Sequence, residues 1–237
     1  MSSTLFIADL HLDCARPAVT RALAQFLSQH NNCDRLYILG DLFDAWIGDD
    51  DDAPIATEVA SILRQFTAAG PGLFIMQGNR DFLLGNTFCQ MVGAQLLPDP
   101  TVIDLYGEPT LLMHGDSLCT SDAEYMAFRA TARDPEWQAN LLSQSLDERR
   151  ALAKQLRSMS REASSNKAED IMDVTPSEVV KVMQEAGVKR LIHGHTHRPA
   201  RHEGDYGVRW VLGDWGSSGW VITASDNDIN INNFVIN

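Results

Sequence analysis

Five short polar motifs are spread along this 237-residue chain, and their side chains are of the types that bind divalent metal ions. Each motif follows an apolar run that is typical of a buried strand. Together they supply two aspartates, one asparagine and four histidines, which is enough to hold two ions side by side. Two adjacent ions are suited to promoting attack on phosphorus. The motifs are Asp9-Leu10-His11, Gly40-Asp41, Gly78-Asn79-Arg80-Asp81, His114-Gly115-Asp116 and Gly194-His195-Thr196-His197.

The spacing within two of the motifs predicts that neighbouring ligands share an ion. In an extended segment, Asp9 and His11 would project to the same side, because side chains alternate with a period of two. His195 and His197 have the same spacing. Oxygen and imidazole ligands without thiolates favour manganese, iron or zinc over a structural cysteine–zinc site. The glycine in each of the last four motifs suits a tight turn or a close backbone approach to a ligand.

The elements that must position these motifs alternate between strand and helix. The pattern predicts a parallel sheet with helices on its faces, in which ligands bind at the carboxyl ends of the strands. The expected fold class is therefore α/β, with two sheets packed face to face and flanked by helices. Strands are predicted at 5–8, 36–39, 73–76, 111–113, 191–192, 208–213, 220–224 and 229–236, and the first helices at 19–27 and 54–66.

Residues 121–171 break the alternation, because they contain no clear strand and their apolar residues repeat at helical spacing. This segment follows the fourth motif and precedes the fifth, so both of its ends must lie near the metal ligands. We interpret it as a helical cap on a core of residues 1–120 and 172–237. Its apolar faces would be formed by Tyr125, Phe128 and Ala132 and by Leu152, Leu156 and Met159. Periodicity alone favours the interpretation that these side chains pack against one another in a small core of the cap.

Composition limits the classes of partner and compartment. The net charge of −13 argues against nucleic-acid binding. No apolar run approaches the ~20 residues that a membrane-spanning helix needs. No signal peptide is expected, since no basic region followed by an apolar stretch opens the chain. The cysteines show no Cys-x-x-Cys spacing, as expected for reduced thiols in the cytoplasm. One local basic stretch comprises Arg149, Arg150, Lys154, Arg157, Arg161 and Lys167, with Glu162 as its only acidic residue.

The five motifs resemble those of the calcineurin-like metallophosphoesterases, whose pattern is D-x-H, G-D, G-N-H-[DE], a later histidine and G-H-x-H. The resemblance spans about residues 4–215 and implies an αββα sandwich with a dinuclear metal centre. It assigns one ion to Asp9, His11, Asp41 and His197. It assigns the other ion to Asp41, Asn79, His114 and His195, so that Asp41 bridges the two ions.

Arg80 departs from this pattern, because many members of the superfamily have a histidine after the asparagine. A histidine there is assigned to protonating the leaving group or stabilising its charge. Arginine cannot act as a general acid, but its guanidinium can bind phosphate oxygens with two hydrogen bonds. A phosphate leaving group needs little protonation. Arg80 therefore favours a substrate with two linked phosphates.

Longer motifs resemble one family within the superfamily, the UDP-2,3-diacylglucosamine diphosphatases of lipid A biosynthesis. These motifs are residues 7–11, 40–50, 78–85, 113–116, 171–174 and 192–199. The resemblance implies two Mn²⁺ ions and attack of metal-bound water on the α-phosphorus. It also implies UMP and 2,3-diacylglucosamine 1-phosphate (lipid X) as the products. It places the protein in the cytoplasm, peripherally on the inner membrane, and no obligate protein partner is expected.

The resemblance also implies roles for individual residues. The catalytic residues would be Asn79, Arg80, His114 and His195. The substrate would be held by Asn79, Arg80, Asp122, Ser160, Ser164, Lys167 and His195, where Ser164 replaces a frequent asparagine. An acyl-chain slot would be lined by Tyr125, Phe128, Ala132, Leu152, Ala153, Leu156, Met159 and Ile171. Arg149, Arg150, Lys154, Arg157 and Arg161 would face anionic lipid headgroups or form an ordinary solvated helix face.

Two other functions remain open at this point. A different phosphodiesterase or phosphatase of the superfamily would need the same metal motifs but no apolar cap. A non-catalytic binding scaffold would keep the fold without needing the ligands, whereas all seven candidate ligands are present here.

Overall fold

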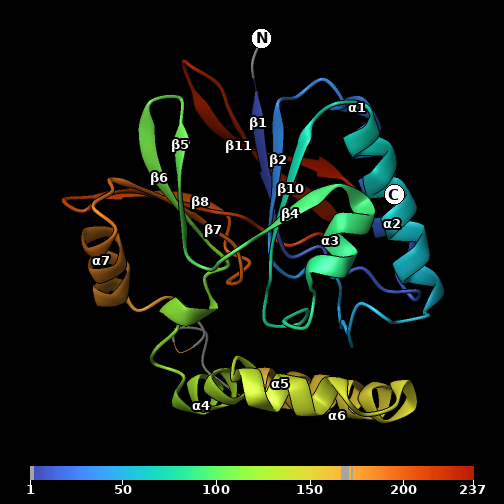
Figure 1. The fold of residues 1–237 in the computed structure, drawn as a ribbon. Coiled ribbons are helices and arrows are strands. Elements are labelled where there is room, and N and C mark those ends of the chain that lie inside the picture. Colours follow the sequence, from blue (N-terminus) through green and yellow to red (C-terminus); the bar gives the residue numbers. More distant parts are fainter. Residues whose placement is uncertain (1–2, 167–170, 172) are drawn as a thin grey trace.

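The computed structural model describes residues 3–166, 171 and 173–237 of the chain, without the side chains of 161 and 163–166 (Figure 1). Strands and helices alternate through the first two fifths of the chain. This part comprises β1 (Thr4–Ile7), α1 (Pro17–Gln29), β2 (Arg35–Leu39), α2 (Pro54–Ala68), β3 (Gly72–Met76), α3 (Asn86–Val92) and β4 (Ala94–Leu97). Proline stands in the first turn of both α1 and α2, where its missing N–H removes no helical hydrogen bond.

The first sheet has six strands in the order β11-β10-β1-β2-β3-β4. β1 to β4 are parallel, and β10 (Ser218–Ala224) and β11 (Ile229–Val235) complete the sheet in antiparallel pairing. Ile7, Ile38 and Ile75 lie side by side in this register. The carboxyl ends of β1, β2 and β3 therefore meet at one edge, directly before the first three motifs.

The second sheet has five strands in the order β5-β6-β7-β9-β8. β6, β7 and β9 are parallel, and Met113 pairs with His193, so the fourth and fifth motifs also leave the sheet at one level. The strands are β5 (Thr101–Leu105), β6 (Glu108–Met113), β7 (Arg190–His193), β8 (Ala200–Gly204) and β9 (Gly207–Val211).

Three clusters of buried side chains hold four layers together. Alternation along β1 directs Leu5 and Ile7 toward α1 and α2, and Phe6 toward the second sheet. The interface between the sheets contains Phe6, Tyr37, Leu112 and Ile192 among others. The outer face of the second sheet packs on α7 (Pro176–Glu185) through Leu191, Val179 and Met183. Figure 1 shows α1, α2 and α3 on one side of the two sheets and α7 on the other. The predicted α/β sandwich is confirmed.

Three helices between residues 123 and 166 lie together at the bottom of Figure 1, below the two sheets. They are α4 (Ala123–Ala132), α5 (Pro135–Leu142) and α6 (Leu146–Asn166), and they follow the short 3-10 turn Asp116–Leu118. Asp122 and Asp134 cap α4 and α5 by accepting hydrogen bonds from the backbone N–H groups of Tyr125 and Trp137. No helix in the described part of the chain is long and apolar enough to cross a membrane.

The sequence did not indicate β4, β5, β8, α3 or α7. β4 and β8 are edge strands, and the sequence of β8, Ala-Arg-His-Glu-Gly, has no apolar run because most of it is exposed. β5 alternates with only Leu105 buried. Short or exposed strands of this kind obtain their conformation from pairing with neighbouring strands, which a hydrophobic pattern does not reveal.

Candidate active site

The predicted metal ligands converge where five strands end. Ligand atoms of Asp9, His11 and His197 lie within 4.8 Å of one another, as do those of Asp9, Asp41 and His114. All five side chains are buried except His197, which is about one third exposed. The motifs that were scattered along the chain thus form two adjacent groups that share Asp9.

Asp41 lies close to a histidine of each group, and Asn79 connects His114 to the remaining predicted ligand, His195. The Asp41 carboxylate lies 3.6 Å from His11 Nδ1 and 3.9 Å from His114 Nε2. Asn79 Oδ1 lies 3.0 Å from His114 Nε2 and 2.9 Å from His195 Nδ1. Asp41 therefore stands between the two groups, in a position that would allow it to contact both ions.

The backbone of the ligand loops is not extended, which corrects the prediction from residue alternation. Asp9, His11, Asp41, His195 and His197 all have positive φ, between 50° and 68°. Only one other non-glycine residue in the described part of the chain, Tyr106, has this conformation. Left-handed backbone is unfavourable for residues with a Cβ, and such strain concentrates at functional sites. The Asp-x-His and His-x-His pairs thus converge through left-handed turns and not through strand geometry.

Two motif glycines are required because ligand side chains pass directly over them. A Cβ on Gly78 would lie 2.0 Å from Asp41 Oδ1, and one on Gly194 would lie 2.4 Å from Asp9 Oδ2. The close approach is thus to the carboxylates of two predicted ligands. Any side chain at either position would displace Asp41 or Asp9.

The buried carboxylate of Asp81 ties two ligand loops together. It accepts hydrogen bonds from the backbone N–H groups of Gly78 and Leu42, both at 2.7 Å, and of Asp41 at 3.2 Å. The same loops are linked by the backbone N–H of Arg80, which donates to Asp41 Oδ1 at 2.8 Å. Asp81 thereby holds the loop of Asp41 against the loop of Asn79.

The electrostatics of the cluster favour ligands that are ready to bind a cation. Burial and the nearby Arg80 charge lower the pKa of His11 to about 2, and burial and His114 lower that of His195 to about 4. Both imidazoles are therefore neutral at neutral pH, the form that binds metals. Burial opposes ionisation of Asp9, but His197 and the other nearby histidines hold its pKa well below the usual range.

Asp41 and two orphaned atoms show where positive charge would fit. Burial raises the pKa of Asp41 to about 7, because the site withdraws this carboxylate from water. The buried atoms Asp9 Oδ1 and His11 Nδ1 have no hydrogen-bond partner. Unpartnered buried polar atoms are costly. Both atoms face other predicted ligands: Asp9 Oδ1 lies 3.4 Å from His197 Nε2, and His11 Nδ1 lies 3.6 Å from Asp41 Oδ2. The donor set thus fits divalent cations held by oxygen and imidazole.

Two histidines on the same strand end provide a matched pair for testing this site. His193 is fully buried like His114, but it faces away from the ligand cluster, with Nε2 3.1 Å from Arg209 and Nδ1 2.8 Å from the Gly194 carbonyl. We expect His195→Gln to lower the bound metal measured by elemental analysis, because it removes a predicted ligand. His193→Gln should keep the metal and lose only stability, about 1–3 kcal/mol in the free energy of unfolding. Equal metal loss in both variants would contradict the assignment.

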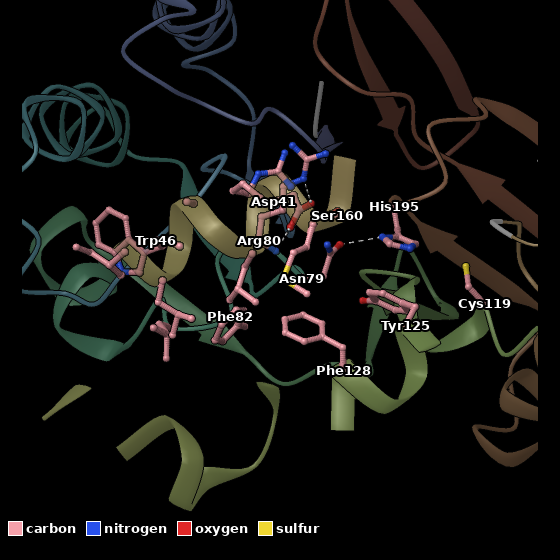
Figure 2. A pocket seen from close by; sticks show the side chains of 18 of the residues that line it. Asp41, Trp46, Asn79, Arg80, Phe82, Cys119, Tyr125, Phe128, Ser160 and His195 are labelled. Atoms are coloured by element: carbon pink, nitrogen blue, oxygen red, sulfur yellow. Dashed lines mark hydrogen bonds and ion pairs between the residues drawn. The ribbon is translucent and has the colours of Figure 1, made fainter. Parts of the chain in front are cut away.

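A single cavity of about 790 Å³ joins the ligand cluster to the three helices. One part of its wall is polar and includes Asp41, Asn79, Arg80, His195 and His197. Figure 2 shows Asn79 near the middle of this pocket, with His195 to its right, Phe82 and Trp46 to its left and Phe128 below it. The apolar part of the wall includes Ala45, Trp46, Ile47, Phe82, Leu83, Phe128, Leu141, Leu152, Ala153, Leu156 and Met159.

Most of the residues assigned to an acyl-chain slot line this cavity. Tyr125, Phe128, Leu152, Ala153, Leu156 and Met159 do so, together with the substrate candidates Asp122 and Ser160. Ala132 does not, because the end of α4 packs on the core, where Ala132 is 3% exposed. Ile171 is exposed and outside the lining. Lys167 and the Ser164 side chain lie outside the described part of the chain.

Sequence patterns did not predict the apolar residues that the core contributes to the cavity wall. Trp46, Ile47, Phe82 and Leu83 follow the motif residues Asp41 and Arg80 closely in the chain. Large apolar residues in loops directly after polar ligands are a signal that could have revealed them. Trp46 stacks on Phe43 with ring centroids 4.4 Å apart, which fixes this side of the wall.

Three arginines of α6, Arg149, Arg150 and Arg157, form ion pairs with the core, which neither interpretation of the basic stretch had predicted. Arg149 is 4% exposed and donates two hydrogen bonds to Asp50, at 2.7 and 2.5 Å. Arg150 pairs with Asp51 and Asp52. Arg157 pairs with Asp44 at 3.0 Å. These arginines neutralise an acidic loop of the core, which the charge pattern of α6 alone could not show. Lys154 is exposed, and the Arg161 side chain lies outside the described part of the chain.

Comparisons with known proteins agree with this site. A family model for calcineurin-like phosphoesterases matches residues 2–199. Relatives named UDP-2,3-diacylglucosamine hydrolase include one from Cellvibrio japonicus, 57% identical over 99% of this chain and 100% of the relative. Another, from Marinobacter nauticus, is 53% identical over 95% of this chain and 94% of the relative's length.

A solved structure of an archaeal phosphodiesterase superimposes with a TM-score of 0.52. It covers 98% of this chain and 99% of its own at 10% sequence identity, which supports the fold. The ligand cluster and the family match together indicate a metal-dependent hydrolase of phosphoester or pyrophosphate bonds. The chain belongs to the calcineurin-like phosphoesterases and, among them, to the family of the UDP-2,3-diacylglucosamine hydrolases.

Proposed function

We propose that this protein hydrolyses the diphosphate of UDP-2,3-diacylglucosamine in lipid A biosynthesis, giving UMP and 2,3-diacylglucosamine 1-phosphate. The observation that carries the proposal is the single cavity in which the ligand cluster continues into an apolar wall. A phosphatase for a polar substrate has no need of such a wall. The names of the relatives supply the substrate.

The seven predicted ligands would hold two divalent ions, for which we propose Mn²⁺. Asp9, His11, Asp41 and His197 would hold one, and Asp41, Asn79, His114 and His195 the other. When bound, the ions supply Lewis-acid stabilisation of charge on phosphorus and lower the pKa of a water molecule.

Arg80 would hold the diphosphate beside this centre. Two carboxylates fix its guanidinium: Asp41 lies 3.4 Å from Arg80 Nε, and Asp44 forms an ion pair with Arg80 Nη1. The guanidinium would therefore present donors to the phosphate oxygens in an orientation that the protein has already set. Preset donors cost little reorganisation when charge develops, which is the main source of transition-state stabilisation. The leaving lipid phosphate needs no general acid, which matches an arginine at this position. His114 and His195 would act as ligands beside Asn79.

The helices α4 to α6 would form a cap that receives the two acyl chains. Apolar side chains line the cavity on two sides: Phe82 and Trp46 belong to the core, and Leu152 and Phe128 belong to the helices. Burying acyl chains gains about 0.8 kcal/mol for each CH₂ removed from water. We propose that the protein meets its lipid substrate peripherally at the cytoplasmic face of the inner membrane.

The test of the proposal is hydrolysis of UDP-2,3-diacylglucosamine by metal-depleted protein with and without added Mn²⁺. We expect activity with the metal and, in ¹⁸O-water, the label on UMP, because water attacks the α-phosphorus. Label on the lipid phosphate would contradict that site of attack. Activity on a phosphoprotein alone would indicate another phosphatase, and a protein that stays inactive with Mn²⁺ would indicate a binding scaffold.

The apolar wall gives a separate prediction. Leu152→Glu should raise KM for UDP-2,3-diacylglucosamine on the order of tenfold or more, because it places a charge where acyl chains would be buried. Hydrolysis of the small substrate bis(p-nitrophenyl) phosphate should change little. The control is Leu142→Glu, since Leu142 is 43% exposed and outside the cavity lining. If both variants raise KM equally, the wall does not bind the acyl chains.

A further inference from the structure

Asp44 contacts two arginines of the cavity wall but does not itself line the cavity. It lies in the loop after β2, three residues beyond Asp41. Its side chain is 23% exposed, and both of its oxygens are occupied by guanidinium groups. It therefore reaches the substrate only through its partners.

The first partner is Arg80 of the core. Asp44 Oδ1 accepts a hydrogen bond from Arg80 Nη1 at 2.5 Å, while Asp41 lies 3.4 Å from Arg80 Nε. Two carboxylates on different edges of a planar guanidinium fix its orientation. Among the residues that the structure describes, none accepts a hydrogen bond from Arg80 Nη2. The guanidinium is thus held by the protein on one side and available on the other.

The second partner is Arg157 of α6. Its Nε donates to Asp44 Oδ2 at 3.1 Å and its Nη2 to Oδ1 at 3.0 Å, which makes a two-bond pair between helix and core. Burial and then the charge of Arg80 lower the pKa of Arg157, so the two cations are close enough to repel each other. The Asp44 carboxylate lies between the two guanidinium groups and offsets their repulsion, so that both can line the same part of the cavity wall.

We propose that Asp44 is a positioning residue that couples the cap to catalysis by holding Arg80 and Arg157 in one ion-paired unit. The inference rests on the proposed function, in which Arg80 binds the diphosphate. When α6 is in place, Arg157 satisfies Asp44 and fixes the carboxylate that orients Arg80. The position of the cap thereby sets the position of a phosphate-binding group.

Asp50 provides a matched control in the same loop. It forms the equivalent two-bond pair with Arg149, eight residues earlier on α6, and none of its hydrogen bonds or ion pairs involves Arg80. Asp50→Asn therefore weakens the attachment of the cap without disturbing the arginine at the phosphates. Asp44→Asn weakens the attachment and also replaces one acceptor by an NH₂ group that opposes the guanidinium.

The experiment compares Asp44→Asn, Asp50→Asn and Asp44→Glu with the wild type. kcat and KM are measured on UDP-2,3-diacylglucosamine, and the affinity of the Mn²⁺-loaded protein for methylenediphosphonate is measured by calorimetry. We expect Asp44→Asn to lower kcat and the diphosphonate affinity about tenfold or more, because small misplacement of a catalytic group is costly. Asp50→Asn should leave kcat and that affinity unchanged, and Asp44→Glu should restore part of both.

Equal effects of Asp44→Asn and Asp50→Asn on all three quantities would overturn the inference, because Asp44 would then only attach the cap. A rise in KM with unchanged kcat and unchanged diphosphonate affinity would also overturn it. A wild type that is inactive on the lipid substrate would instead refute the proposed function. In that case the diphosphonate affinities of the same variants would still decide whether Asp44 positions Arg80.

Discussion

Asp41→Asn is expected to abolish hydrolysis and to release bound metal. Asp41 is 1% exposed and lies between the two ligand groups, 3.6 Å from His11 and 3.9 Å from His114. Asparagine keeps the shape of the side chain but removes the charge and one acceptor oxygen. Metal ions contribute several kcal/mol to transition-state stabilisation, so their loss should lower kcat on the order of 10³-fold or more.

The measurement is elemental analysis of metal content together with kcat at saturating Mn²⁺. The control is Asp104→Asn, which changes an exposed carboxylate on β5 that accepts a hydrogen bond from the Gly107 N–H. That variant should keep the metal and the activity. Full metal content in active Asp41→Asn protein would show that the bridging position belongs to another residue. Asp9, which belongs to both ligand groups, would then be the candidate.

Arg80→Met is expected to lower kcat/KM for UDP-2,3-diacylglucosamine about 10²-fold while the metal content stays unchanged. Methionine keeps an unbranched chain of similar reach but removes the donors that would face the phosphates. Loss of a preset donor at developing charge costs about 10²–10³ in rate. The backbone N–H of Arg80, which holds Asp41 at 2.8 Å, remains in the variant, so the ligand loops should stay in place.

The matched control is Arg150→Met, since Arg150 pairs with Asp51 outside the cavity lining. It should change kcat/KM little. Metal loss in Arg80→Met would mean that Arg80 supports the ligand loops and not the substrate. An unchanged kcat/KM would remove the argument that an arginine at this position selects a diphosphate.

The candidate metal ligands were identifiable from the sequence because each motif is local. Asp9, His11 and the other ligands follow apolar strands, and parallel strands bring their carboxyl ends to one edge. The alternation of strand and helix likewise follows from short-range hydrophobic patterns, so β1, α1, β2, α2 and β3 were all predicted. Residue spacing nevertheless gave the wrong reason for the convergence of Asp9 and His11, since positive φ is a backbone property that spacing does not encode.

The tertiary structure alone decided how the helices of residues 123–166 meet the core. Arg157 and Asp44 are 113 residues apart, and nothing in the composition of α6 indicates that its arginines turn to an acidic loop. The apolar wall likewise combines Trp46 and Phe82 with Leu152, from segments that are distant in the chain. The sequence by itself determined the local strands, the loops after them and the ligands that those loops carry. Docking between distant segments, which depends on the shape and charge of both surfaces, decided the cavity and the surroundings of Arg80.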